Sequence, residues 1–163
     1  MSYDIFIDGK AGTTGLKVAS RLASHPHVRV LDLNDALRKD MSARLDMIAK
    51  ADLAILCLPD VAAIEVANAA NTMDVCLIDA STAHRTHSEW TYGFAEMDAG
   101  QRSFLTSSKR ISNPGCYPTG LIALLRPLIK SGVIASDADI TVPATSGYSG
   151  GGNAMIATHD AGD

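Results

Sequence analysis

Short apolar segments that alternate with helical segments constrain the fold of this chain more than any other feature. Strands are expected over residues 3–7, 28–33, 53–58 and 75–78, and helices over residues 14–24, 41–51 and 61–70. Buried strands that alternate with helices indicate a parallel sheet with helices on both faces. The pattern predicts an α/β protein with a doubly wound, mostly parallel Rossmann-type sheet.

Composition narrows the range of possible partners and locations. Hydrophobic residues make up 47% and charged residues 20% of the 163 residues, which is ordinary for a globular protein and argues against disorder. The net charge of -4, without a basic run, argues against nucleic acid as a partner. No apolar run reaches the roughly 20 residues that a membrane span needs. The N-terminus has no signal-peptide organisation, and the odd number of cysteines fits a reducing cytoplasm.

The last part of the chain departs from this alternation. Another strand is expected over residues 140–142, followed by the turn-rich segment TSGYSGGGN and a helix start at residues 153–159. We therefore expect a dinucleotide-binding domain over residues 1–136 and the beginning of a second, incomplete α/β domain over residues 137–163. On this interpretation the sequence is an N-terminal portion of a longer protein.

A glycine-rich turn follows the first expected strand. Gly9, Gly12 and Gly15 lie in the run DGKAGTTGL, directly before the first expected helix. Glycines in this position let a pyrophosphate approach the backbone at a helix N-terminus, and Thr13 and Thr14 add hydroxyl donors. The spacing is GxxGxxG instead of the usual GxGxxG, so a plain strand–helix turn remains an alternative.

The second expected strand carries conflicting signals about the cofactor. Asp32 lies near its end, where an acidic residue binds the ribose hydroxyls of NAD. Arg38 and Lys39 follow and are suited to the additional phosphate of NADP. A solvated charged loop is the alternative for these two basic residues.

A cysteine stands where strand-like sequence gives way to a helix. Cys116 lies in SNPGCYPTG, ahead of the apolar helical segment at residues 120–130, with Pro118 at the expected first turn. A helix N-terminus favours the thiolate, which is the nucleophilic form of cysteine. Cys57 and Cys76 lie in or beside apolar strands and are expected to be small buried hydrophobes. We therefore expect Cys116 to be a catalytic nucleophile.

Six segments together resemble the shorter type of N-acetyl-gamma-glutamyl-phosphate reductase, from about Tyr3 to Ile156. They are DGKAGTTG, LCLPD, DASTAHR, YGFAEM, SNPGCYPTG and TSGYSGGG. The resemblance implies an oligomeric enzyme that reduces an acyl phosphate to N-acetylglutamate semialdehyde with NADPH, through a thioester on Cys116, in arginine biosynthesis. The related aspartate-semialdehyde dehydrogenase is one alternative, although the glycine turn and NPGCYPTG favour the reductase. A non-catalytic NADP-binding module is another.

The resemblance also implies roles for individual residues. Residues that would hold the NADP(H) cofactor are Gly9, Gly12, Thr13, Thr14, Gly15, Pro59 and Ser81, and Arg38 is added to them because of its position after the second expected strand. Residues that would face the substrate are Arg85, Arg110, Asn113, Ser146 and Gly147, although Arg85 also suits a structural ion pair. No metal is implied.

The family also needs a histidine as the acid–base partner of the cysteine. His25 and His27 flank a proline in a turn and are expected at the surface, whereas His84 and His87 follow the fourth expected strand. His159 matches no family pattern. We therefore expect this histidine to lie beyond Asp163 and the 163-residue chain alone to have little activity.

Overall fold

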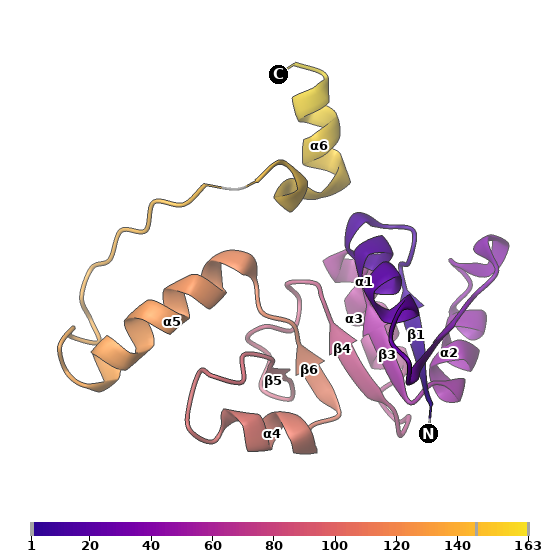
Figure 1. Ribbon diagram of the computed structural model, residues 1–163, viewed down its shortest axis with the longest axis horizontal. Coiled ribbons are helices and arrows are strands. Elements are labelled where there is room, and N and C mark those ends of the chain that lie inside the picture. The colour runs from indigo at the N-terminus through magenta and orange to yellow at the C-terminus, as the bar shows by residue number, and fades with distance from the viewer. Residues whose placement is uncertain (1, 146, 163) are drawn as a thin grey trace.

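The protein is built around one six-stranded parallel sheet. The computed structural model describes residues 2–145 and 147–162. The strand order is β2-β1-β3-β4-β6-β5 (Figure 1), and each pair of neighbours runs parallel. The strands are β1 (Tyr3–Asp8), β2 (Val28–Leu31), β3 (Leu53–Leu56), β4 (Cys76–Asp79), β5 (Thr91–Tyr92) and β6 (Arg110–Ser112). The predicted α/β class and parallel sheet are confirmed.

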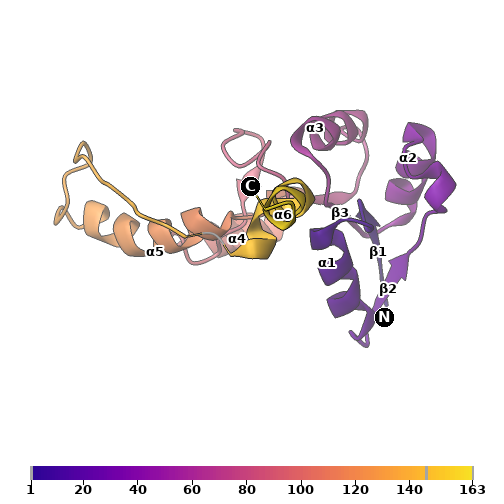
Figure 2. The same cartoon turned by 90° about the horizontal axis from the view of Figure 1, so that it is seen from above.

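Helices cover both faces of the sheet, as a doubly wound fold requires. Figure 2 shows α2 and α3 on one side of the strands and α1 on the other. The α-helices are α1 (Thr13–Ala23), α2 (Met41–Lys50), α3 (Asp60–Ala69), α4 (Gln101–Ser107), α5 (Cys116–Lys130) and α6 (Gly152–Asp160). Short 3-10 turns occupy Asp35–Leu37 and Tyr148–Gly151.

The apolar core lies between the central strands and the helices α2 and α3. The last four residues of β1 are all buried, whereas in β3 and β4 buried residues alternate with partly buried ones. Both faces of these strands are thus at least partly covered, which is consistent with their mainly apolar sequences. The buried cluster consists of Phe6, Ile48, Ala54, Leu56, Val66, Ala67, Ala70, Val75 and Leu77. Burial of these side chains supplies most of the free energy that holds the sheet and helices together.

Polar residues lie in one row across the carboxyl edge of the sheet. The strand register pairs Asp8 with Leu56, Leu56 with Asp79, Asp79 with Ser112, and Ser112 with Tyr92. Asp8, Asp79 and Ser112 are buried although they are polar. Open parallel sheets bind ligands at this edge, so the row marks where the functional site is expected.

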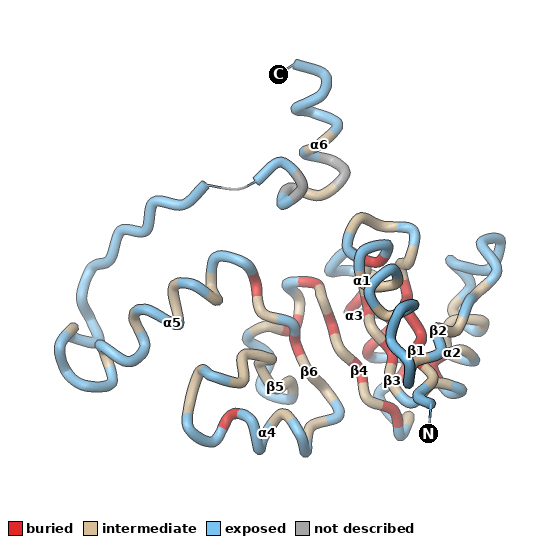
Figure 3. Tube along the Cα trace, viewed as in Figure 1, coloured by how far each residue is buried: buried red, intermediate tan, exposed pale blue. Residues whose placement is uncertain are grey.

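The expectation of a strand at residues 140–142 is wrong. Residues 133–145 form no helix or strand, and Ile140 and Val142 are exposed. A short apolar segment becomes a strand only when a neighbouring strand accepts its hydrogen bonds, and the described part of the chain offers it none. Figures 1 and 3 show this exposed segment leading from α5 to α6, which stands apart from the sheet.

Helix α5 extends away from the strands, and none of its residues is buried. Asp98, in the loop before α4, accepts hydrogen bonds from Arg126 and Lys130 and so holds the second half of α5. These contacts hold the pKa of Asp98 at about 2. Among the described residues, no helix combines the length and the apolar character that crossing a bilayer requires.

Candidate active site

The turn between β1 and α1 contains three glycines with different steric requirements. Gly9 has a φ of +81°, and a Cβ there would lie 2.2 Å from the carbonyl oxygen of Cys57. A Cβ on Gly15 would lie 2.3 Å from the carbonyl oxygen of Gly9. Gly12 differs, because its nearest neighbour would be 3.4 Å away, an ordinary contact. The fold itself therefore requires glycine at positions 9 and 15, whereas Gly12 leaves its backbone open.

This turn borders a cleft of about 580 Å³ at the carboxyl edge of the sheet. Gly12 is the N-cap of α1 and makes no side-chain cap, so the first amides of that helix have neither an intrahelical partner nor a side-chain cap. The cleft is lined by residues of the glycine turn, of the segment after β2 and of the end of β3. Of the predicted cofactor residues, those that line it are Gly9, Gly12, Arg38 and Pro59.

Charged side chains gather at the β2 end of the cleft. Lys10 Nζ lies 2.8 Å from Asp32 Oδ1, so this acidic residue is already paired. Arg38 and Lys39 line the same cleft and are exposed. The structure therefore brings together both of the cofactor signals that the sequence left in conflict.

The remaining predicted cofactor residues lie next to the cleft. Thr13 and Thr14 begin α1 immediately after Gly12, and Gly15 is buried in the first turn of that helix. Ser81 is 7% exposed, and its hydroxyl is directed to Asp79 Oδ2 at 2.6 Å. Ser81 thus serves the internal structure of its loop and is not among the residues that line the cleft.

Sequence reasoning missed a buried ion pair at the base of the cleft. Asp8 is 3% exposed, and Arg44 Nε lies 3.5 Å from its Oδ1 and donates to the carbonyl of Arg38 at 2.7 Å. Burial raises the pKa of Asp8, although the charge of Arg44 opposes the shift. Burial also raises the pKa of the Cys57 thiol to about 11, and the charge of Asp8 adds to this. Arg44 therefore ties the segment that carries Arg38 to the end of β1.

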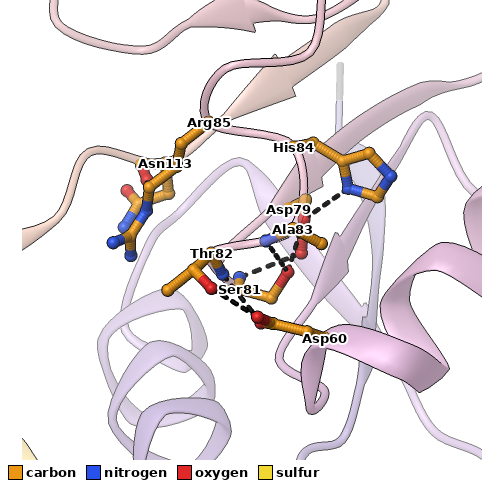
Figure 4. A network of polar contacts seen from close by, with 8 residues as sticks. All are labelled: Asp60, Asp79, Ser81, Thr82, Ala83, His84, Arg85 and Asn113. Carbon is orange, nitrogen blue, oxygen red and sulfur yellow. Dashed lines mark hydrogen bonds and ion pairs between the residues drawn. The ribbon is translucent and has the colours of Figure 1, made fainter.

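A second network organises the loop after β4 (Figure 4). Asp79 is fully buried; its Oδ1 accepts from Ser81 N at 2.9 Å, and its Oδ2 lies 2.6 Å from His84 Nδ1. The His84 ring stacks on Trp90 with centroids 4.1 Å apart. These contacts hold the DASTAHR loop, residues 79–85, on the buried end of β4. An acidic residue at the end of a buried strand was the available sequence signal for Asp79.

The same loop is tied to the start of α3. Asp60 accepts hydrogen bonds from the backbone N–H and the hydroxyl of Thr82 (Figure 4). These bonds lower the pKa of Asp60, and the positive charge of Arg85 adds to the effect. Because Asp60 directly follows the cleft-lining Pro59, the loop after β4 is linked to the cofactor cleft.

Cys116 is the first residue of α5, and it is exposed. The helix begins two residues earlier than Pro118, with Gly115 as its N-cap. Arg85 Nε donates to the carbonyl of Asn113 at 3.2 Å, beside this helix start. The structure thus brings together three of the predicted residues, namely Cys116, Asn113 and Arg85.

The structure does not place Arg110 with this group. Arg110 begins β6, whereas Cys116 follows the opposite end of that strand. Its guanidinium donates to backbone carbonyls around the end of α3, including Val75 O at 2.7 Å and Ala70 O at 3.1 Å. These bonds satisfy carbonyls that a helix end leaves unpaired, so Arg110 has a structural task away from the site.

The two remaining predicted substrate residues are Ser146 and Gly147. No described contact brings Gly147 or a histidine next to Cys116. Ser146 lies outside the described residues, and Gly147 is the N-cap of the 3-10 turn before α6. His159 is exposed on α6, and the ring of Tyr148 lies against it. In the described part of the chain, no histidine is hydrogen-bonded to Cys116, and His84 is engaged by Asp79.

Comparison with known families defines the class of this protein. Its residues 34–103 match the family model described as semialdehyde dehydrogenase, NAD binding domain. Residues 116–162 match semialdehyde dehydrogenase, dimerisation domain, which therefore includes α5. The chain is thus similar to semialdehyde dehydrogenases over both matched segments, and the first match supports a nicotinamide dinucleotide as the cofactor class. The boundary between residues 136 and 137 stays a prediction.

Among curated proteins the chain is similar to N-acetyl-gamma-glutamyl-phosphate reductases, which confirms the predicted resemblance. It is 48% identical to N-acetyl-gamma-glutamyl-phosphate reductase 2 of Nostoc sp., over 96% of this chain and 48% of that protein. It is also 48% identical to the reductase of Burkholderia orbicola, over 98% of this chain and 51% of that protein. The chain thus spans about half the length of the curated relatives that it matches.

Solved structures support the same fold. Aspartate semialdehyde dehydrogenase II of Vibrio cholerae, complexed with ASA, superposes with a TM-score of 0.63 at 16% identity, over 96% of this chain and 50% of that one. The aspartate semialdehyde dehydrogenase of Francisella tularensis gives a TM-score of 0.65 at 14% identity, over 95% and 47%. At these identities the likeness establishes the fold alone.

Proposed function

We propose that this chain forms the cofactor-binding and nucleophile-bearing part of an N-acetyl-gamma-glutamyl-phosphate reductase, which makes N-acetylglutamate semialdehyde with NADPH in arginine biosynthesis. The observation that carries the proposal is the exposed Cys116 at the start of α5, at the same sheet edge as the dinucleotide cleft. The similarity to reductases over 96% of the chain supports the substrate. We place the reaction in the cytoplasm, in a homo-oligomer whose contacts involve the dimerisation-domain segment.

The cleft fits a nicotinamide dinucleotide. The backbone of Gly12 is open, and the uncapped amides of α1 suit a diphosphate, to which Thr13 and Thr14 would add hydroxyl donors. Asp32 is neutralised by Lys10, whereas Arg38 in the same cleft is exposed and suits a 2′-phosphate. This arrangement favours NADPH over NADH. When bound, the nicotinamide supplies the hydride of the reaction.

The residues around Cys116 suit acyl transfer from a phosphate. The thiolate attacks the acyl carbon, the C–O bond to phosphate breaks, and a thioester remains on Cys116. After hydride transfer the hemithioacetal breaks its C–S bond, which releases the aldehyde and restores the thiolate. Arg85 and Asn113 lie beside the cysteine and would orient substrate oxygens or stabilise the developing oxyanion.

The proton partner of Cys116 is proposed to come from elsewhere in the complete enzyme. His84 is buried and bonded to Asp79, and His159 is exposed on a helix that stands apart from the sheet. We therefore propose that the acid–base histidine lies in the part of the relatives' length that this chain does not span. The 163-residue chain alone should then reduce acyl phosphates slowly.

Replacement of Cys116 tests the proposal in the complete enzyme. Cys116→Ser should abolish NADPH oxidation with N-acetyl-gamma-glutamyl phosphate and leave the Kd for NADPH nearly unchanged, because the cleft is formed by other residues. Cys76→Ser is the matched control, since Cys76 is half-buried in β4 and should leave turnover intact. Turnover by Cys116→Ser, or a large loss of NADPH affinity, would contradict the proposed division of roles. Preference for aspartyl phosphate would instead identify an aspartate-semialdehyde dehydrogenase.

A further inference from the structure

Gly115, the residue before Cys116, lies directly against the side chain of Arg85. A Cβ on Gly115 would be 2.6 Å from Arg85 Nη1 and 3.1 Å from its Cζ. The φ of Gly115 is -75°, which any residue adopts, so the need for glycine here comes from space and not from backbone conformation. A side chain at position 115 and the guanidinium therefore compete for the same volume.

Arg85 is held in this place by its own hydrogen bonds. Its Nε donates to the carbonyl of Asn113 at 3.2 Å, and its backbone N–H donates to the carbonyl of Thr82 at 3.4 Å. Figure 4 shows the Arg85 side chain running alongside Asn113, away from the His84 side of the loop. The guanidinium thus contacts two of the three residues that lead into α5.

Both ends of this contact are anchored on one buried residue. The carboxylate of Asp79 holds Ser81 and His84 of the Arg85 loop, while the carbonyl of Asp79 accepts from Asn113 N at 2.7 Å. A side chain fixed by such neighbours can hold a functional group in place, and misplacement of about 1 Å can cost about a hundredfold in rate.

We propose that Arg85 is a positioning residue that braces residues 113–115 and thereby fixes Cys116 at the first turn of α5. This task is separate from any contact between Arg85 and the substrate. The inference rests on the proposed role of Cys116 as the nucleophile. Gly115 contributes to this positioning, because only glycine at this place leaves room for the Arg85 guanidinium.

Amide hydrogen exchange of the complete enzyme tests the brace without requiring turnover. Arg85→Met should speed exchange over residues 113–119 by about tenfold, the equivalent of one lost hydrogen bond. Gly115→Ala should have a similar effect, because its Cβ displaces the guanidinium from Asn113. The double variant should exchange little faster than Arg85→Met, since the guanidinium is already gone and only the 3.0 Å approach of the new Cβ to Pro118 Cδ remains. Arg102→Met, which removes an exposed arginine paired with Glu96, should change nothing.

Steady-state kinetics separate positioning from substrate binding. Arg85→Met should lower kcat by about a hundredfold with little change in KM, whereas loss of a ground-state substrate contact would raise KM. Loss of oxyanion stabilisation would also lower kcat, but it would leave exchange over residues 113–119 unchanged. Arg85→Lys should resemble Arg85→Met, because lysine keeps the charge but lacks the Nε donor. Unchanged exchange over residues 113–119 in Arg85→Met, additive effects in the double variant, or a rise in KM alone would overturn the inference. A wild-type enzyme inactive on acyl phosphates would instead refute the proposed function.

Discussion

The contrast between Gly9 and Gly12 gives the sharpest test of how the glycine turn is built. Gly9 has a φ of +81°, which an alanine rarely adopts. The Cβ of Gly9→Ala would also lie only 2.2 Å from the carbonyl oxygen of Cys57, the residue that follows β3. A left-handed backbone costs an alanine about 1–2 kcal/mol. Relieving the overlap requires a backbone shift that costs about 1–3 kcal/mol. We therefore expect a loss of about 2–5 kcal/mol, a large share of the roughly 5–15 kcal/mol that stabilises a typical domain.

Gly12→Ala is the matched control in the same turn. Its Cβ would meet nothing closer than 3.4 Å, so the free energy of unfolding should fall by less than about 1 kcal/mol, the cost of a poorer N-cap. NADPH binding should nevertheless weaken by about tenfold, because a diphosphate needs the open backbone there. Urea unfolding followed by the fluorescence of Trp90, with NADPH titrations alongside, measures both quantities. Equal destabilisation by the two substitutions, or a loss below about 1 kcal/mol in Gly9→Ala, would refute the steric argument.

Two further predictions concern residues outside the cleft. Arg110→Met should lower the free energy of unfolding, measured by urea titration, by about 2–3 kcal/mol, because it leaves carbonyls at the end of α3 unpaired. Unchanged NADPH affinity in this variant would confirm a purely structural role for Arg110. Unchanged stability would contradict that role. The pKa of Asp98 is lowered to about 2 in the folded protein, so its stabilising contribution is complete above the unfolded value of 3.8 and is lost as the pH falls through about 2. The stability advantage of the wild type over Asp98→Asn should therefore shrink across that range, and an advantage that persists below it would contradict the assignment.

The sheet could be predicted from sequence because its signal is local. Parallel strands whose two faces are at least partly covered are mainly apolar, and four of the strands were predicted from such segments. The strand β5 was not predicted because a strand of two residues is too short to show a periodic pattern of apolar residues. A strand was wrongly predicted at residues 140–142. The segment contains apolar residues, but among the described residues no strand lies beside it to accept its hydrogen bonds.

The site was predictable only where a residue type is tied to a local turn. Gly9, Gly15 and Cys116 could be chosen as candidates from the sequence because each stands at a strand-to-helix junction. Arg110 lies away from the other candidate residues, and its hydrogen-bond partners are backbone carbonyls, which cannot be inferred from residue types. The pairing of Asp8 with Arg44 joins a strand to a helix across 36 residues and follows only from the fold.

The position of β6 between β4 and β5 links the assembly of the sheet to the placement of Cys116. β5 pairs with β6 and not with β4, so residues 91–92 cannot enter the sheet before residues 110–112 have docked. During synthesis from the N-terminus, β1 to β4 can complete their pairing while the far edge still waits. Cys116 follows β6 by only four residues. Docking of β6 therefore places Cys116 at the carboxyl edge of the sheet, and a chain in which β6 has not yet docked has no ordered position for this cysteine.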